Sequence, residues 1–177
     1  LMAHAYAHLY DIPSTCLRFF TVYGPYGRPD MAYFKFTKAI LEGQPIDVYN
    51  NGNMQRDFTY IEDIIEGIMR LMSKAPSVQK PDTSNAEAPF KVYNIGNNNP
   101  IELSRFIRAI ETATGIDAKR NNLPMQAGDV PVTYAGVDDL MADVGFKPDT
   151  SIEDGIKQFV QWYHEYISFT NDMSALS

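Results

Sequence analysis

The chain of 177 residues has little cysteine, little positive charge and no long apolar run. Its one cysteine, Cys16, excludes an internal disulfide, and its apolar neighbours favour a packed thiol over a nucleophile. This cysteine usage fits a reducing compartment, so we expect a cytoplasmic protein. No apolar run approaches the roughly 18 residues of a membrane span, and the first residues lack the layout of a signal peptide. We therefore expect no membrane partner.

Positive charge is also scarce: the chain has 15 Lys and Arg residues and 22 Asp and Glu residues, which gives a net charge of -7. A nucleic-acid partner would require a basic face, so we expect none. A nucleotide-sized anion would need only a local cluster of positive groups. The hydrophobic fraction of 45% and charged fraction of 21% are those of a globular protein with one packed domain.

The pattern of apolar residues predicts alternating helices and strands, and so an α/β fold. The predicted helices are 1–10, 31–41, 61–73, a helix from Pro100 to Gly115, 138–144, and a last helix that begins near 148–151 and frays from Thr170. The predicted strands are one that opens the stretch 17–30, a hairpin of 46–49 and 56–60 around the turn 50–53, and short strands at 91–95 and 118–121. The polar segment 75–90 is expected to be a flexible surface loop.

The stretch 17–30, LRFFTVYGPYGRPD, is the most informative part of the chain. It opens as an apolar strand and then breaks at two glycines and two prolines, which forbid regular structure. Open α/β sheets bind ligands in loops that leave the carboxyl ends of their strands. Arg28 and Lys35 add positive charge there, which suggests an anionic ligand. The alternative is an ordinary surface loop.

One pair of residues has metal-ligand spacing. His4 and His8 lie one helical turn apart and could share a zinc ion. However, no Glu follows His4, as a zinc protease would require, and no third ligand is near in sequence. We therefore expect no metal site.

The run 18–32, RFFTVYGPYGRPDMA, resembles the extended short-chain dehydrogenase/reductase family, within it the NAD-dependent nucleotide-sugar 4-epimerases, and most of all the UDP-glucuronate 4-epimerases. The resemblance covers nearly the whole chain. It implies a protein with a Rossmann half, which binds NAD through a glycine-rich turn, and a smaller half that holds the nucleotide sugar. Catalysis in this family uses a Tyr-x-x-x-Lys pair, whose tyrosine is the base.

Two signatures of that family are missing from the sequence. None of the eleven tyrosines is followed four residues later by a lysine, and no Gly-x-x-Gly-x-x-Gly occurs. The resemblance therefore implies that residues 1–177 are a single fragment, the last part of a Rossmann-type sheet plus the α/β substrate-binding domain. The helix 1–10, which has no start signal, fits this interpretation. We expect no catalytic residue in the chain, and NAD held mainly by an absent N-terminal half.

The resemblance also implies substrate contacts around the loop 17–30. Thr21 stands where many relatives have an asparagine facing the sugar, and its hydroxyl could bind a sugar hydroxyl or carboxylate. Arg28 is expected to face the sugar or phosphate end, and Asp30 and Met31 to flank the nucleotide. Residues 19 and 20, both Phe, would lie near the nicotinamide, although core packing explains Phe19 and Phe20 equally well.

Three further residues complete the predicted site. Arg56 resembles the arginine that pairs with the diphosphate, although Asp57 could instead be its structural partner. Asp129 resembles the acidic residue that binds the ribose hydroxyls. Gln126 stands where many relatives have an arginine, so a phosphate contact there could be weaker or replaced.

Together these features suggest part of an NAD-dependent isomerase that converts UDP-glucuronate to UDP-galacturonate by transient oxidation at C4. A UDP-glucuronate decarboxylase, a sugar-nucleotide dehydratase and a non-catalytic nucleotide-sugar-binding module remain as alternatives. The resemblance implies a homodimer for the full-length protein. It also implies an exposed apolar face where the Rossmann half would dock.

Overall fold

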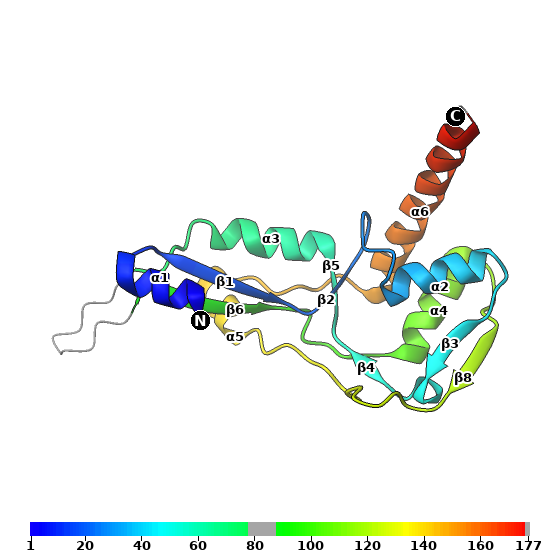
Figure 1. Ribbon diagram of the computed structural model, residues 1–177, viewed down its shortest axis with the longest axis horizontal. Coiled ribbons are helices and arrows are strands. Elements are labelled where there is room, and N and C mark those ends of the chain that lie inside the picture. The colour runs from blue at the N-terminus through cyan, green and yellow to red at the C-terminus, as the bar shows by residue number, and fades with distance from the viewer. Residues whose placement is uncertain (78–87, 176–177) are drawn as a thin grey trace.

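The structure is a computed structural model that describes residues 1–77 and 88–175, with side chains up to residue 170 (Figure 1). Helices and strands alternate along it, and a 3-10 turn, Asn50–Gly52, follows β3. The elements are α1 (Met2–Tyr10), β1 (Ser14–Phe19), β2 (Thr21–Tyr23), α2 (Ala32–Leu41), β3 (Ile46–Tyr49), β4 (Gln55–Arg56), β5 (Phe58–Tyr60), α3 (Ile61–Leu71), β6 (Phe90–Ile95), β7 (Ile101–Glu102), α4 (Leu103–Thr114), β8 (Arg120–Leu123), α5 (Asp138–Val144) and α6 (Ile152–Ala175).

The elements form two lobes along the long axis of the molecule (Figure 1). The first lobe contains β1, β6, α1, α3 and α5, and its apolar cluster is centred on Ile64, Leu71, Tyr93, Ile95 and Leu140. The second lobe contains α2, α4, β3, β8 and the first turns of α6 around a larger cluster rich in aromatic rings. Strands β2 and β5 lie between the lobes, so the chain crosses this middle region several times.

Parallel pairing dominates the strand topology. β1 pairs with β6, from Ser14 opposite Phe90 to Phe19 opposite Ile95, β2 pairs with β5, and β3 pairs with β8. Only the pair of β4 and β7 is antiparallel among the described strands. Parallel partners require long crossover connections, which here include helices. This arrangement confirms the predicted α/β fold class.

Two strand predictions were wrong. The strand predicted after residue 17 is two strands separated at Phe20, each with a different partner. The hairpin predicted around residues 50–53 does not form, because β3 pairs with β8 and the return strand breaks at Asp57 into β4 and β5. The turn itself is present, with Asn50, Asn51 and Gly52 at positive φ. Local turn chemistry thus predicted the turn, whereas distant segments provided the strand partners.

Most helices occur where their apolar periods predicted them. The last helix, α6, buries one face, formed by Ile152, Ile156, Phe159, Val160 and Tyr163. However, α6 continues to Ala175, so the fraying predicted from Thr170 is wrong. The predicted strand 118–121 lies two residues later, at Arg120–Leu123. Most of the predicted loop 75–90 lies outside the described residues.

Apolar surface is exposed on the first lobe. On α3, Ile65 and Met69 are more than half exposed, and so is its C-cap residue, Met72. α1 exposes Leu9 and Tyr10, among others, and buries only Ala7. Among the described strands β1 pairs only with β6, and Phe19 at its end is half exposed. The described part of the chain contains no helix long and apolar enough to cross a membrane.

A tight contact joins α6 to β2 and generates a stability prediction. A Cβ on Gly155 would collide with the buried ring of Tyr23, whose hydroxyl donates to the Ser151 carbonyl 3.2 Å away. We expect Gly155→Ala to lower the free energy of unfolding by about 1–3 kcal/mol through overpacking.

The matched control is Gly67→Ala in α3, where a Cβ would lie 3.5 Å from the nearest side-chain atoms, at ordinary contact distance. This change should raise the free energy of unfolding by about 0.5–1 kcal/mol, as alanine does in a helix. Urea denaturation measures both variants. A stabilised Gly155→Ala variant would contradict the overpacking explanation.

Candidate functional site

A cavity of about 230 Å³ opens in the second lobe, between the carboxyl-terminal half of the β3 strand, the start of α2 and the strands β4 and β5. Three of the predicted substrate residues, Thr21, Arg56 and Asp129, line it. Its other walls are mainly apolar or aromatic and are formed by Ala32, Phe36, Asp47, Tyr49, Met54, Phe58, Ile101 and Leu103. A mainly apolar pocket with a few convergent polar groups is typical of small-ligand sites.

The guanidinium of Arg56 is the centre of charge in this cavity. Its Nη2 donates to Asp129 Oδ1 at 2.9 Å, and its Nη1 donates to the Val130 carbonyl at 2.5 Å. The side chains of Arg56 and Asp129 are 22% and 32% exposed, so the pair is partly shielded from water. A cation and an anion therefore face the same cavity from segments 73 residues apart in sequence. Asp129, rather than Asp57, is the described ionic partner of Arg56.

Strand pairing brings Thr21 to the same place. The parallel register sets Thr21 opposite Phe58, two residues after Arg56. Because β2 begins immediately after the break at Phe20, the half-buried Thr21 lines the cavity near Arg56. Its hydroxyl is a donor and acceptor that suits a sugar hydroxyl or carboxylate.

A second cavity of about 420 Å³ adjoins the first. The two share the residues Ala32, Phe36, Asp47 and Tyr49 as walls. Asp30 and Lys35 line the second cavity. Arg56 lines the first cavity and Lys35 lines the second, so each of the two adjoining cavities has one cationic side chain in its wall.

Arg28 does not line either cavity. Its side chain is 75% exposed and forms an ion pair with Asp30, and the hydrogen bond from Arg28 lowers the pKa of that carboxyl. Met31 is the N-cap residue of α2 and packs against the large core cluster. Gln126 is exposed, and its carbonyl accepts a hydrogen bond from the Asp129 amide across a turn. Phe20 is partly buried.

Residues that the sequence reasoning missed line both cavities. Phe36, Asp47 and Tyr49 form the shared wall, yet the sequence analysis assigned them only to a helix and a strand. One of them could have been identified from the sequence, because Asp47 is a polar residue between the buried Ile46 and Val48. In an alternating strand such a residue faces away from the core.

Three buried tyrosines of the described chain are poor bases. Burial raises the pKa of the Tyr23 hydroxyl, and it also raises those of Tyr33 and Tyr60. A tyrosine that acts as a general base at neutral pH needs a lowered pKa instead. These three side chains are therefore suited to packing and hydrogen bonding.

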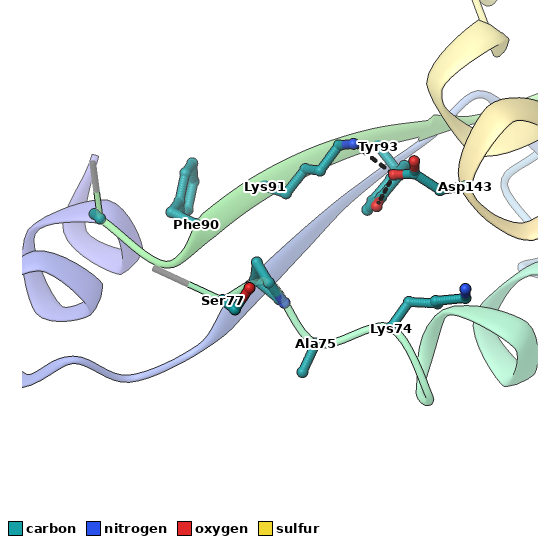
Figure 2. Close-up of a pocket in the computed structure, with 9 residues that line it drawn as sticks. Lys74, Ala75, Ser77, Phe90, Lys91, Tyr93 and Asp143 are labelled. Atoms are coloured by element: carbon teal, nitrogen blue, oxygen red, sulfur yellow. Dashed lines mark hydrogen bonds and ion pairs between the residues drawn. The ribbon is translucent and has the colours of Figure 1, made fainter. Parts of the chain in front are cut away.

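Figure 2 shows a different cavity, of about 320 Å³, beside the amino-terminal part of β6. Lys91 and Tyr93 both donate to Asp143 Oδ2 at 2.5 Å, and these bonds, Lys91 foremost, lower the pKa of the Asp143 carboxyl. None of the predicted substrate residues lines it. Ligands of parallel sheets bind at the carboxyl ends of strands. The cavity around Arg56 is therefore the better candidate site.

No group of three or more potential metal ligands lies together within the described ranges 1–77 and 88–175. The ring of His4, one of the two weighed as zinc ligands, packs edge-on against Phe90 with ring centroids 5.0 Å apart.

The Arg56–Asp129 pair gives a second testable prediction. Asp129→Asn should lower the free energy of unfolding by only about 0.5–1 kcal/mol, because the pair is partly exposed. Arg56→Gln should cost more, because it also removes the guanidinium hydrogen bonds to the Gln55, Val130 and Pro131 carbonyls. Chemical denaturation measures both.

The control is Glu153→Gln in the half-exposed pair of Arg105 and Glu153, which should change stability by a few tenths of a kcal/mol. If Asp129→Asn and Arg56→Gln lower the free energy of unfolding equally, the hydrogen bonds from Arg56 to the backbone carbonyls do not contribute to stability.

Comparison with known proteins places this site in a family. A sequence model of the NAD dependent epimerase/dehydratase family matches residues 1–96, which is more than half of the chain. Protein CapI of Staphylococcus aureus is 59% identical over 172 residues, which cover 94% of this chain and 52% of the relative. A probable UDP-glucuronate 4-epimerase of Rhizobium meliloti is 53% identical over 172 residues, which cover 93% of this chain and 50% of the relative.

The fold gives the same result. UDP-glucuronic acid 4-epimerase from Bacillus cereus, solved in complex with UDP-glucuronic acid and NAD, matches with a TM-score of 0.78 and 30% identity. That match covers 93% of this chain and 49% of the solved chain. The chain thus spans about half the length of these relatives. On this evidence the chain belongs to the NAD dependent epimerase/dehydratase family.

Proposed function

We propose that the chain is the substrate-binding part of a nucleotide-sugar 4-epimerase that converts UDP-glucuronate to UDP-galacturonate. The observation that carries the proposal is the convergence of Thr21, Arg56 and Asp129 on one cavity. It is supported by a relative named as a probable UDP-glucuronate 4-epimerase and by a similar structure in complex with UDP-glucuronic acid and NAD. Because the chain spans half of these proteins, the activity is that of a protein containing this chain and the remaining half.

Each residue of the cavity has a proposed role. The planar guanidinium of Arg56 binds the diphosphate, whose oxygens replace the Asp129 carboxylate as its ionic partner. Asp129, released from Arg56, accepts hydrogen bonds from the ribose hydroxyls. Thr21 donates a hydrogen bond to a hydroxyl or the carboxylate of the sugar. These exchanges require only side-chain motions within the cavity.

The remaining predicted residues act from its edge. Arg28 would bind the anion at the sugar or phosphate end by exchanging its exposed partner Asp30 for the ligand. Asp30 and Met31 would flank the nucleotide at the start of α2, where the second cavity adjoins the first. Gln126 would shape the turn that carries Asp129, and would supply a weaker polar contact than an arginine.

The proposal includes NAD, held mainly by the half of the relatives that this chain does not match. The half-exposed Phe19 ring lies at the carboxyl end of β1, where it and the next residue, Phe20, would lie near the nicotinamide. NAD would supply reversible oxidation at the sugar C4. The edge of β1 that pairs with no described strand and the exposed apolar residues of α1 are suited to dock that second half. We further propose a cytoplasmic homodimer.

Ligand titration tests the binding site. The unsubstituted chain should bind UDP-glucuronate in a calorimetric titration, with NAD as a control ligand. Arg56→Gln should raise the Kd for UDP-glucuronate by about tenfold to a hundredfold, as expected for the loss of a charge-assisted hydrogen bond. Arg105→Gln, which removes a surface arginine paired with Glu153, should bind normally. An equal loss of affinity for UDP-glucuronate in Arg56→Gln and Arg105→Gln would refute a specific role of Arg56.

Product analysis tests the reaction. The protein that contains this chain together with the second half should convert UDP-glucuronate to UDP-galacturonate. A UDP-pentose with release of carbon dioxide would indicate a decarboxylase, and a dehydrated 4-keto sugar would indicate a dehydratase. Tight binding of the sugar nucleotide without turnover would favour a non-catalytic binding module.

A further inference from the structure

The residue after Arg56 is a buried carboxylate held by backbone amides. Asp57 is 0% exposed. Its Oδ1 accepts the Asn97 amide at 3.0 Å, and its Oδ2 accepts the amides of Asn98 at 3.0 Å and Ala135 at 2.8 Å. These donors come from the turn after β6 and from the segment that follows Asp129. One carboxylate thus joins three parts of the chain.

The segment 129–136, here called the strap, runs alongside β4 toward the first lobe. The Gln55 amide donates to the Pro131 carbonyl at 2.9 Å, and the Thr133 amide donates to the Gln55 carbonyl at 3.3 Å. Arg56 binds Asp129 and the Val130 carbonyl at the start of the strap. Ala135, near the strap's other end, is fully buried and donates to Asp57. Arg56 and Asp57 therefore hold opposite ends of the same segment.

We propose that Asp57 is a positioning residue for the ligand site, which acts by anchoring the strap so that Asp129 lies in the cavity. This inference rests on the proposed function, because it names what holds the ligand groups in place. When a diphosphate takes Arg56 from Asp129, the strap loses its ionic contact at one end. The amide hydrogen bonds of Asp57 then keep the strap in place, and Asp129 remains near the ribose.

The surroundings of Asp57 leave little room for another arrangement. A Cβ on Gly96 would collide with the Ala135 side chain and lie 3.2 Å from Asp57 Oδ2. Glycine at position 96 therefore allows the strap to approach the turn after β6 closely enough for the carboxylate to bind both. Thr59 Oγ1 also accepts the Asn97 amide at 3.1 Å, which orients the same turn.

The first experiment replaces the carboxylate by an amide of the same shape. Asp57→Asn turns one acceptor into a donor that faces backbone N–H groups. We expect faster hydrogen exchange at the Ala135 and Thr133 amides without ligand, and a Kd for UDP-glucuronate raised by about tenfold or more, because misplaced binding groups are costly. The matched control is Asp63→Asn, whose carboxylate accepts the Thr150 amide at 3.1 Å and does not contact the strap.

The outcomes of this experiment distinguish a failure of the proposed function from a failure of the positioning role of Asp57. No binding by the unsubstituted chain would overturn the proposed function, and the positioning role with it. If the unsubstituted chain binds, an unchanged Kd or unchanged exchange in Asp57→Asn would overturn the positioning role alone. Equal weakening by Asp63→Asn would also overturn it, since that result would reflect a general loss of stability.

A second variant keeps the test valid if Asp57→Asn fails to fold. Gly96→Ala should displace the strap by collision with Ala135, and so weaken UDP-glucuronate binding with Asp57 intact. The double variant Gly96→Ala/Ala135→Gly removes that collision and should recover a substantial part of the affinity. Normal binding by Gly96→Ala, or no recovery in the double variant, would overturn the inference.

Discussion

The buried carboxylate of Asp57 is the constraint on which the middle of the molecule depends. A buried carboxylate is costly unless it is fully hydrogen-bonded, and the described partners of this one are backbone amides. They can reach it only if β5, the turn after β6 and the strap lie at fixed separations. The same carboxylate sits where the chain passes from β4 to β5, between the lobes. Its hydrogen bonds therefore set the geometry of the region that lines the cavity.

The neighbouring residues Arg56 and Asp57 have different roles in this region. Successive side chains of an extended segment point to opposite sides, so Arg56 faces the cavity while Asp57 faces the interior. The guanidinium is partly exposed, which fits its proposed exchange of the carboxylate partner for an anionic ligand. The amide contacts of Asp57 are separate from the ion pair of Arg56 and Asp129. A rigid support next to an exchangeable ion pair suits a site that must bind and release a charged ligand.

The first lobe is unusual for a parallel sheet. Parallel strands are normally buried on both faces, yet β1 is only partly buried and ends at the half-exposed Phe19. The chain matches about half of its relatives. The exposed surface of the first lobe agrees with the proposal that a second half docks there, whereas the second lobe has a large core of its own. The candidate site lies mainly on that better-packed lobe.

The sequence by itself determined the α/β class, most helix positions and the family, because apolar periodicity and the run 18–32 are local patterns. The sequence also identified Thr21, Arg56 and Asp129 as candidate substrate-binding residues, but through resemblance to a family rather than through geometry. Only the tertiary structure decided that β3 pairs with β8, that Asp129 rather than Asp57 neutralises Arg56, and that Phe36 and Tyr49 line the cavities. The physical reason is range: turns and helix faces depend on residues a few positions apart, whereas strand partners, ion pairs and buried carboxylates depend on segments that meet only after folding.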